Sequence, residues 1–466
     1  MRYISTRGEA PVLNFSDALL AGLARDGGLY LPETWPQFSK ADIAALAGKS
    51  YQDIAFAVLT PFVAGDIAPA ALRAMIDEAY GTFRHDAVCP LVQTGANEFI
   101  AELFHGSTLA FKDVAMQLLA RLMDHVLSER DQRATIVGAT SGDTGGAAID
   151  AFAGRSRTDM FILFPHGKVS PVQQRQMTTS TASNVHALAI EGNFDDCQAL
   201  VKAMFNDHKF RDHLQLSGVN SINWGRIMAQ VVYYFSTAIS LGSPHRAVSF
   251  TVPTGNFGDI FAGYVAVKMG LPIERLVIAT NDNDILARTF ETGTYEMRGV
   301  CQTTSPSMDI QISSNFERLL FETHDRDAGA VRRMMAGLSQ SGSFSIEAAP
   351  LAKMRAQFSA GRSTMAETAK VIADMMTSDG YLAEPHTAVG IKVARDQKPS
   401  KTPMIILSTA HPAKFPDAVK AASGVYPALP HFLSDLMERK EQFTVLSSAL
   451  ELVQKHIQEH ARVLKA

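Results

Sequence analysis

The amino-acid sequence predicts an α/β protein in which parallel-type sheets are flanked by helices, with an added helical domain at the N-terminus. Its 466 residues and 46% hydrophobic content are enough for roughly two to four domains with buried cores. Helical patterns dominate up to about residue 95, and beyond it short apolar runs alternate with amphipathic helices. Such alternation is typical of parallel α/β layers.

The N-terminal domain is predicted to span residues 1–95. Within it, Ser16 is expected to cap the first helix, and the pair Gly27-Gly28 is expected to end it. Beyond residue 95, short apolar runs predict the strands of the α/β layers, at residues 134–137, 160–164, 185–190, 247–252, 276–279 and 404–407.

Apolar residues that recur every fourth position predict a helix between Lys112 and Arg130, with Lys112 at its beginning. The apolar stretch 231–241 is too short for a bilayer and is interrupted by hydroxyl residues, so we expect a buried helix there. The C-terminal segment 431–466 is predicted to be helical and to pack on the α/β part of the chain. Its apolar positions are Leu446, Leu450, Val453, Ile457 and Leu464.

Charge and cysteine content exclude several classes of partner. The chain carries 43 Lys+Arg against 47 Asp+Glu, so it has no basic field to attract nucleic acid or an anionic membrane. Its cysteines, Cys89, Cys197 and Cys301, are far apart and lack C-x-x-C spacing, which disfavours both a disulfide framework and a zinc site. The N-terminus also lacks the apolar stretch of a secretory signal. We therefore expect a cytoplasmic protein that binds a small molecule and no metal.

Three segments rich in glycine or hydroxyl groups follow predicted strands, at the strand ends where α/β sheets bind ligands. Residues 139–146 could bind a carboxylate or phosphate, and residues 254–259 place two glycines where backbone amides can approach a phosphate. For both loops an ordinary structural turn is an equal alternative. In residues 408–412 a hydroxyl could face a ring nitrogen, although a cap or turn is the commoner role and His411 is interpreted as structural.

Lys112 lies at a helix start among apolar neighbours, in the segment 105–113. The helix dipole and burial both disfavour a charged lysine at such a position. Schiff-base chemistry requires a lysine with a lowered pKa, because only the neutral amine attacks a carbonyl. Position alone favours the alternative of a solvated lysine paired with Asp113, so the motifs must be considered together.

Considered together, the motifs resemble the threonine synthase family from the N-terminus to about residue 416. The matching segments are STRG, DGGLYLPE, HGSTLAFKDVAMQ, ATSGDTGGAA, KVSPVQQRQM, NSINWGRI, VPTGNFGDIFAGY and LSTAHPAKF. The resemblance implies the two-lobed fold type II architecture of the tryptophan synthase beta-like enzymes. We assign it to residues 96–430, with a smaller lobe of about 110–220 inserted in the larger one. Ser107, where many relatives have proline, is expected to alter loop stiffness and leave the chemistry unchanged.

The resemblance also implies a role for individual residues. Lys112 would be the catalytic residue that binds pyridoxal phosphate covalently. Cofactor binding would further involve Gly255, Asn256, Phe257, Asp259 and Thr409, the last at the pyridine nitrogen with Ser408 as a neighbouring candidate. The substrate's carboxylate would meet the loop of Thr140, Ser141, Gly142, Asp143 and Thr144. Arg226 is assigned to the substrate's phosphate, and Lys168 and Arg175 remain alternatives.

The implied reaction converts O-phospho-L-homoserine and water to L-threonine and phosphate, by γ-elimination and β-addition of water, as the last step of threonine biosynthesis. Lys112 is expected to shuttle protons at Cα and Cβ of the substrate, and one lobe is expected to close over it. Because Thr409 cannot ion-pair with a protonated ring, we expect a largely neutral ring nitrogen. Two alternatives are a related hydroxyamino-acid dehydratase and a non-catalytic phosphoamino-acid-binding protein. A monomer or a homodimer is expected.

Overall fold

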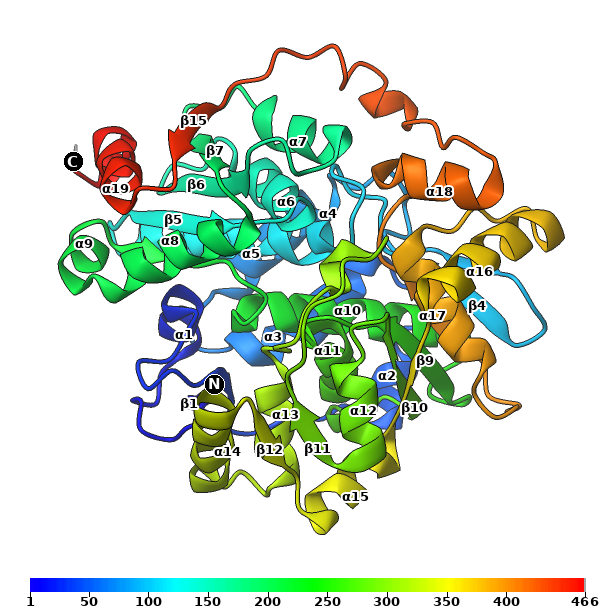
Figure 1. The fold of residues 1–466 in the computed structure, drawn as a ribbon. Helices are drawn as coiled ribbons and strands as arrows, with labels where there is room; N and C mark the ends of the chain where they lie inside the picture. The colour runs from blue at the N-terminus through cyan, green and yellow to red at the C-terminus, as the bar shows by residue number, and fades with distance from the viewer. Residues whose placement is uncertain (465–466) are drawn as a thin grey trace.

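Two largely parallel sheets organise the computed structural model, which describes residues 1–464 (Figure 1). The larger sheet has the order β13-β10-β9-β14-β4-β3, and only its edge strand β3 runs antiparallel. Its strands are β3 (Leu91–Gln93), β4 (Glu98–Glu102), β9 (Val248–Pro253), β10 (Ile273–Thr280), β13 (Phe358–Arg362) and β14 (Met404–Ser408). The predicted α/β class is thereby confirmed.

The smaller sheet has the order β15-β7-β6-β5-β8 and is parallel throughout. Its strands are β5 (Ala134–Ala139), β6 (Thr158–Pro165), β7 (Val185–Glu191), β8 (Leu216–Ser217) and β15 (Thr444–Ser447). Four of them fall between β4 and β9 of the larger sheet along the chain, within the range predicted for an inserted lobe. The helices of this part are α5 (Lys112–Glu129), α6 (Asp143–Phe152), α7 (Pro171–Thr178), α8 (Phe194–Asn206) and α9 (His208–His213).

A buried helix, α10 (Trp224–Ser240), lies at the centre of the molecule and packs against α3 (Tyr51–Val63), α5 and α11 (Gly258–Lys268). It contains the apolar stretch that the sequence predicted as a buried helix. Within residues 1–464, no helix is both long and apolar enough to cross a membrane. Around the larger sheet lie α11 (Gly258–Lys268), α12 (Ile285–Thr292), α13 (Phe316–Thr323), α14 (Ala328–Ser341), α15 (Ala348–Gln357), α16 (Met365–Ser378), α17 (Pro385–Arg395) and α18 (Pro416–Ser423). A separate two-stranded antiparallel sheet pairs β11 (Thr294–Glu296) with β12 (Ser343–Ser345).

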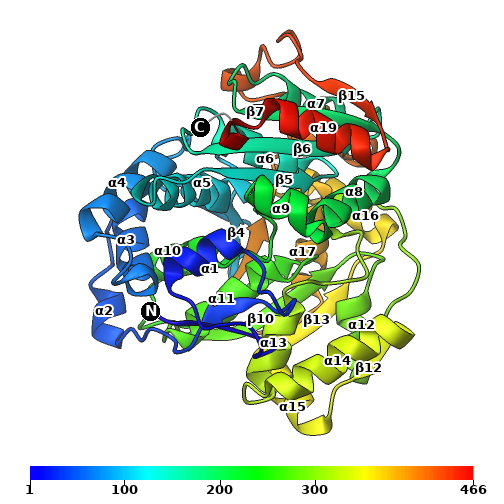
Figure 2. The same cartoon turned by 90° about the vertical axis from the view of Figure 1, so that its left-hand side faces the viewer.

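The N-terminal region combines a small antiparallel sheet with helices that line one side of the molecule (Figure 2). Its elements are β1 (Tyr3–Ser5), α1 (Phe15–Ala21), β2 (Tyr30–Pro32), α2 (Lys40–Ala44), α3 (Tyr51–Val63) and α4 (Pro69–Tyr80). Arg318 on α13 connects this region to the rest of the molecule. Its side chain is fully buried and donates hydrogen bonds to the carbonyl oxygens of Tyr30 and Ile222, at 2.7 and 2.6 Å. Glu317 adds a second connection, accepting from the Thr6 hydroxyl at 2.6 Å.

The predicted limits of the first helix are wrong. Asn14 caps it, with its side chain accepting from the Asp17 backbone N–H at 2.8 Å, because Asn14 has the extended backbone that an N-cap requires. The helix ends at Gly22, and Ser16 lies inside it with its N–H bound to Asp66. Gly28 instead serves close packing of the two N-terminal strands, since a Cβ there would lie 2.3 Å from the Ser5 hydroxyl.

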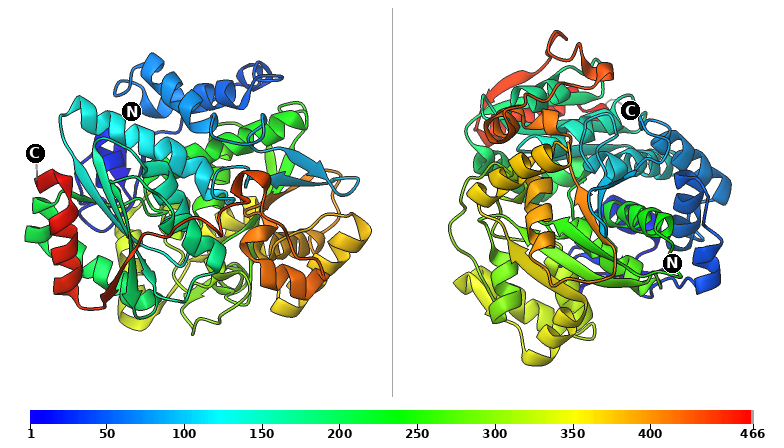
Figure 3. Two further views of the ribbon diagram at one scale, coloured as in Figure 1. Left: turned by 90° about the horizontal axis from the view of Figure 1, so that it is seen from above. Right: turned by 90° about the vertical axis from the view of Figure 1, so that its right-hand side faces the viewer.

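The C-terminal segment contains more than the predicted helix. After α18 the chain arches over the molecule, adds β15 beside β7 and ends in α19 (Leu450–His460) and a short 3₁₀ helix (Figure 3). Leu446 therefore lies in a strand, Val453 and Ile457 are buried against the smaller sheet, and the side chain of Leu464 lies outside the described part. The domain limits at residues 95 and 430 stay a prediction.

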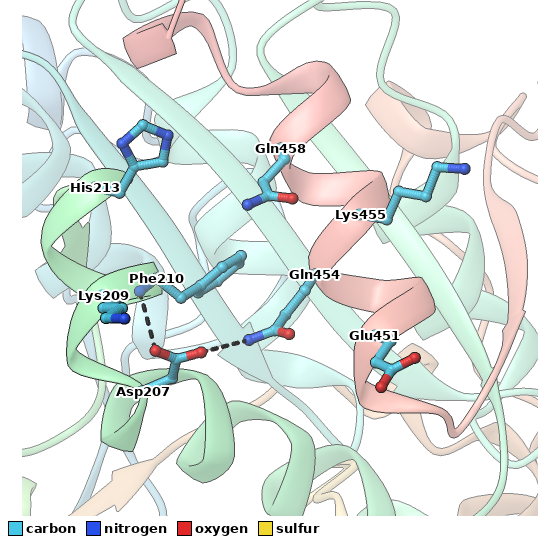
Figure 4. A pocket seen from close by; sticks show the side chains of 8 residues that line it. All are labelled: Asp207, Lys209, Phe210, His213, Glu451, Gln454, Lys455 and Gln458. Atoms are coloured by element: carbon cyan, nitrogen blue, oxygen red, sulfur yellow. Dashed lines mark hydrogen bonds between the residues drawn. The ribbon is translucent and has the colours of Figure 1, made fainter.

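Helix α19 docks beside the smaller sheet through polar as well as apolar contacts. A surface hollow separates it from α9, where Asp207 accepts hydrogen bonds from the Phe210 N–H and the Gln454 side chain (Figure 4). On its other side His460 faces His186 of β7, with ring centroids 5.4 Å apart, and His186 stacks on Phe161 at 4.5 Å.

We predict that this docking weakens in acid. Burial, followed by the charge of His460, lowers the pKa of His186 to about 4 from its ordinary 6.5, and Asp159 opposes the shift. The opened state therefore binds a proton at a higher pH than the docked state, so docking stability is lost as the pH falls from 6.5 towards 4. The amide-exchange protection factors of residues 450–460, corrected for the intrinsic pH dependence of exchange, should fall about tenfold between pH 7 and pH 5, after allowance for partial exposure of the ring.

In the variant His186→Phe the protection factors should change little between the two pH values, whereas the exposed His208→Gln should show the same fall as wild type. Equal acid sensitivity in wild type and His186→Phe, measured on the same peptides by mass spectrometry, would contradict the assignment.

Candidate active site

Lys112 is held next to the end of β14 by backbone hydrogen bonds. The Phe111 N–H donates to the carbonyl of Thr409 at 2.8 Å, and the His411 N–H donates to the carbonyl of Leu109 at 3.0 Å. Leu109 has a φ of 62°, a left-handed conformation that turns the chain into α5 directly before Lys112. The start of α5 and the exit of β14 therefore form one unit, which brings Lys112 and Thr409 together as the sequence predicted.

The Lys112 amine is buried and has polar neighbours from two other segments. It donates to Asp143 Oδ2 and to Ser307 Oγ, both at 3.3 Å, and the residue is 8% exposed. Burial lowers the pKa of Lys112, Asp143 opposes that shift, and the charges of Lys414 and Arg226 reinforce it. A lysine in this environment carries a readily lost proton, as a carbonyl-reactive amine must.

The alternative of a solvated lysine paired with Asp113 is wrong. The Asp113 carboxylate accepts hydrogen bonds from the Thr108 N–H at 2.8 Å and from its hydroxyl at 2.6 Å, and it is fully buried. Gly106 permits this arrangement, because a Cβ there would lie 2.4 Å from the Asp113 carboxylate. Ser107, the departure from the family pattern, hydrogen-bonds to Asp150 of α6.

The predicted phosphate loop connects β9 to α11 and has the geometry of an anion cradle. Phe257 adopts a left-handed backbone, with a φ of 63°, and its buried ring packs on Phe316 and Phe358. Inside the described chain, the backbone N–H groups of residues 255–259 donate to no protein acceptor. A Cβ on Gly255 would lie 2.7 Å from the Ser307 carbonyl oxygen, so the loop needs glycine at this point. Unpaired N–H groups at a helix N-terminus bind phosphate.

The carbonyls of the same loop are fixed from outside. The Ser313 hydroxyl donates to the carbonyl of Gly255 at 2.7 Å, and Asn315 donates to the carbonyl of Asn256 from both its backbone and its side chain, each at 3.0 Å. Asp259 accepts from the Ile260 N–H at 2.8 Å, and its burial raises the pKa of its carboxyl to about 7. The loop is thus rigid before any anion binds.

Arg226 of α10 is a buried cation with few protein partners. Its Nη1 donates to the carbonyl of Val219 at 3.3 Å, while its buried Nε has no acceptor among the described residues. Burial lowers the pKa of Arg226 to about 10, and Asp259 opposes the shift. Of the two alternatives, Lys168 is exposed, and Arg175 donates to the carbonyl of Arg439 at 2.6 Å. Of these three residues, only Arg226 lies near enough to Lys112 for its charge to lower the pKa of the amine.

Two hydroxyls at the end of β14 have different surroundings. Ser408 Oγ lies 2.9 Å from the Thr387 hydroxyl, which in turn donates to Glu384 at 2.8 Å, so Ser408 belongs to a buried polar network. Thr409 is 6% exposed, and its hydroxyl has no hydrogen-bond partner within residues 1–464. Thr409 is therefore the hydroxyl that is available to a ligand. His411 caps the next turn by accepting from the Ala413 N–H, a structural role as expected.

The loop between β5 and α6 uses part of its polar groups to hold itself. The Thr140 hydroxyl accepts from the N–H groups of Gly142 and Gly145, each at 3.0 Å. A Cβ on Gly142 would collide with Gln173 at 2.5 Å, and Gly142 has a φ of 142°. In the part of the chain that is described, the Ser141 and Thr144 side chains make no hydrogen bond, so they are the groups of this loop that a ligand can reach.

The Asp143 side chain faces Lys112 instead of open space. Burial raises the pKa of Asp143, but Lys414 and Lys112 together hold it well below its usual range. A carboxylate that is ionised and already paired repels a second carboxylate. Only the backbone of Asp143, at the start of α6, can therefore favour an anionic substrate group.

Sequence reasoning missed several residues of this site. Lys414, Ser307 and Gln173 all contact Asp143, and His386 accepts from the Ser307 N–H at 3.2 Å. Lys414 lies inside the recognised segment LSTAHPAKF, which was the available signal, whereas Ser307 follows no strand and carries no motif.

These features fit pyridoxal phosphate. The Lys112 amine can bond its aldehyde, the N–H groups of residues 255–259 can donate hydrogen bonds to its phosphate, and the Thr409 hydroxyl can meet its ring nitrogen. Ser307 links the first two, because its hydroxyl touches Lys112 and its carbonyl adjoins Gly255.

Comparisons with known proteins agree with this geometry. Three family models match the chain in order: threonine synthase N terminus at residues 2–80, pyridoxal-phosphate dependent enzyme at residues 91–335, and threonine synthase, C-terminal at residues 387–457.

Full-length relatives give the same result. A threonine synthase from Pseudomonas aeruginosa is 54% identical over 99% of this chain and 98% of its own. The crystal structure of PLP-bound threonine synthase from Brucella melitensis is 71% identical, covers 99% of this chain and 100% of that one, and has a TM-score of 0.98. For threonine synthase from yeast the identity is 40%, the coverage 100% and 99%, and the TM-score 0.94. The chain therefore belongs to the threonine synthase family of pyridoxal-phosphate-dependent enzymes.

Proposed function

We propose that the chain converts O-phospho-L-homoserine and water to L-threonine and phosphate, with pyridoxal phosphate bound to Lys112. One observation carries the choice of substrate: two separate anion-binding groups adjoin Lys112. The N–H groups of residues 255–259 suffice for the cofactor's phosphate. Arg226, whose buried Nε has no acceptor in residues 1–464, is then available for a phosphate on the substrate.

The cofactor would be held by Lys112, by the loop of Gly255, Asn256, Phe257 and Asp259, and by the Thr409 hydroxyl. When bound, pyridoxal phosphate supplies an electron sink for the negative charge that develops on the substrate carbons. A neutral Lys112 amine would take the proton from Cα and move protons at Cβ, and its burial excludes competing water. Asp143 and Ser307 would orient that amine.

The substrate's carboxylate would meet the loop after β5. Its unbonded Ser141 and Thr144 side chains and the backbone at the start of α6 support this role, with Thr140 and Gly142 shaping the loop and the Asp143 side chain directed at Lys112. We also propose a reducing, cytoplasmic location, since Cys89, Cys197 and Cys301 are all free thiols. A monomeric or homodimeric state and closure of one lobe over the substrate stay predictions.

The purified protein should release phosphate from O-phospho-L-homoserine and form threonine, and it should release little ammonia from serine or threonine. Ammonia release without phosphate release would favour the dehydratase alternative. A protein with no visible cofactor band would favour the phosphoamino-acid-binding alternative.

Arg226→Met tests the substrate-phosphate assignment within the same assay. Loss of a buried charge-assisted pair should lower kcat/KM by about 100-fold or more, with the cofactor band retained. The matched variants Lys168→Met and Arg175→Met should stay within a few-fold of wild type. Full activity in Arg226→Met together with a large loss in either control would transfer the role to the control residue.

Thr409→Asp tests the neutral ring nitrogen. A carboxylate would hold a proton on that nitrogen, so threonine formation should fall on the order of tenfold while transamination of the substrate rises. Thr409→Val, which removes the hydroxyl without adding charge, serves as the control for lost contact. Unchanged threonine formation in Thr409→Asp with no rise in transamination would count against the hydroxyl's role.

A further inference from the structure

Lys414 is a fully buried lysine in the 3₁₀ turn Pro412–Lys414 that follows β14. Its ammonium group donates to the carbonyl of Thr108 and to Gln176 Oε1, both at 2.7 Å, and forms an ion pair with Asp143 Oδ1 at 3.1 Å. The ammonium group is therefore enclosed by three protein oxygens in a fully buried position. Because its nearest polar partners are all protein groups, we look for its role in the groups that it holds.

The Asp143 carboxylate is shared between two lysines. Oδ1 faces Lys414 at 3.1 Å and the Gln173 amide at 2.9 Å, while Oδ2 faces Lys112 at 3.3 Å and accepts from Ser307 Oγ at 3.2 Å. The other charged or titratable groups that act on this pair are Arg226 and Asp259 towards Lys112, and His386 towards Asp143. One carboxylate therefore balances one lysine in a buried site, and a proton on the second lysine lacks a counter-charge.

We propose that Lys414 is a positioning residue for Lys112. Lys414 neutralises Asp143 and fixes the orientation of its carboxylate. The other carboxylate oxygen, Oδ2, then directs Lys112 without holding it in its protonated form. Without Lys414, Asp143 would be the ion-pair partner of Lys112 alone and would retain the proton that Lys112 must lose. The inference rests on the proposed function only in taking Lys112 as the cofactor lysine.

The same contacts also give Lys414 a structural role. Thr108 precedes α5, Asp143 begins α6 and Gln176 lies on α7, whereas Lys414 follows β14, the strand that ends at Ser408. One side chain thus joins three segments around the smaller sheet to the exit of β14. Removal of Lys414 could therefore act through loosened structure alone, and the experiment must separate loosened structure from lost charge.

The experiment measures the reactivity of Lys112 against pH in the full-length protein freed of cofactor, by competitive acetylation and mass spectrometry. In Lys414→Met the midpoint should rise by about one pH unit or more, equivalent to about tenfold less neutral amine near pH 7. The double variant Lys414→Met/Asp143→Asn removes both charges, so its midpoint should return close to that of wild type. Lys392→Met, which removes a lysine paired with Glu367 and Asp396 on α17, should leave the midpoint unchanged.

Reconstitution with pyridoxal phosphate gives a second readout. The pH midpoint for recovery of the visible band of the lysine-bound cofactor should follow the acetylation midpoint in each variant. An unchanged Lys112 midpoint in Lys414→Met would overturn the proposal, and so would a double variant shifted as far as the single one, because a purely structural role predicts no restoration. If acetylation behaves as expected but even wild type forms no band, the proposed function fails while the pairing of Lys414 with Lys112 stands.

Discussion

The rest of the site depends on one interaction, the burial of the Lys112 amine beside the Asp143 carboxylate, which Lys112 shares with Lys414. An amine in water is protonated at neutral pH, and an amine in a simple buried ion pair stays protonated. The structure avoids both cases, because Asp143 forms ion pairs with Lys414 as well as with Lys112. Burial then lowers the pKa of Lys112 while the amine keeps a defined direction.

The two sheets bring separate loops to this amine. The smaller sheet supplies Asp143 at the end of β5, and the larger sheet supplies the phosphate loop after β9 and Thr409 after β14. Ser307 is flanked on both sides by segments without regular structure. Its hydroxyl contacts the Lys112 amine, and its carbonyl adjoins Gly255. The N-terminal region contributes through Arg318, which hydrogen-bonds to Tyr30 and to Asn315, the residue that holds the carbonyl of Asn256.

Much of this architecture could be predicted from local sequence, since buried strands such as β6 are continuous apolar runs and α5 shows a clear helical period. Strands β4 and β13 were not predicted, because EFIAE and FSAGR are short and carry charge or glycine. Ser16 was predicted as the cap where Asn14 is observed, because the side chains of both residue types can cap a helix and backbone geometry decides which one does. The motif residues were found through resemblance, whereas the contact of Lys414 with Asp143 joins distant segments and leaves no local pattern. Spacing likewise could not separate Arg226 from Lys168 and Arg175, because burial distinguishes them.

Chemical trapping of the cofactor on the chain tests the central claim most directly. The full-length protein loaded with pyridoxal phosphate would be reduced with borohydride, digested and analysed by mass spectrometry. The account predicts a pyridoxyl group on the peptide that contains Lys112, at close to one per chain. A pyridoxyl group on Lys414 or on an exposed lysine, with Lys112 unmodified, would contradict it.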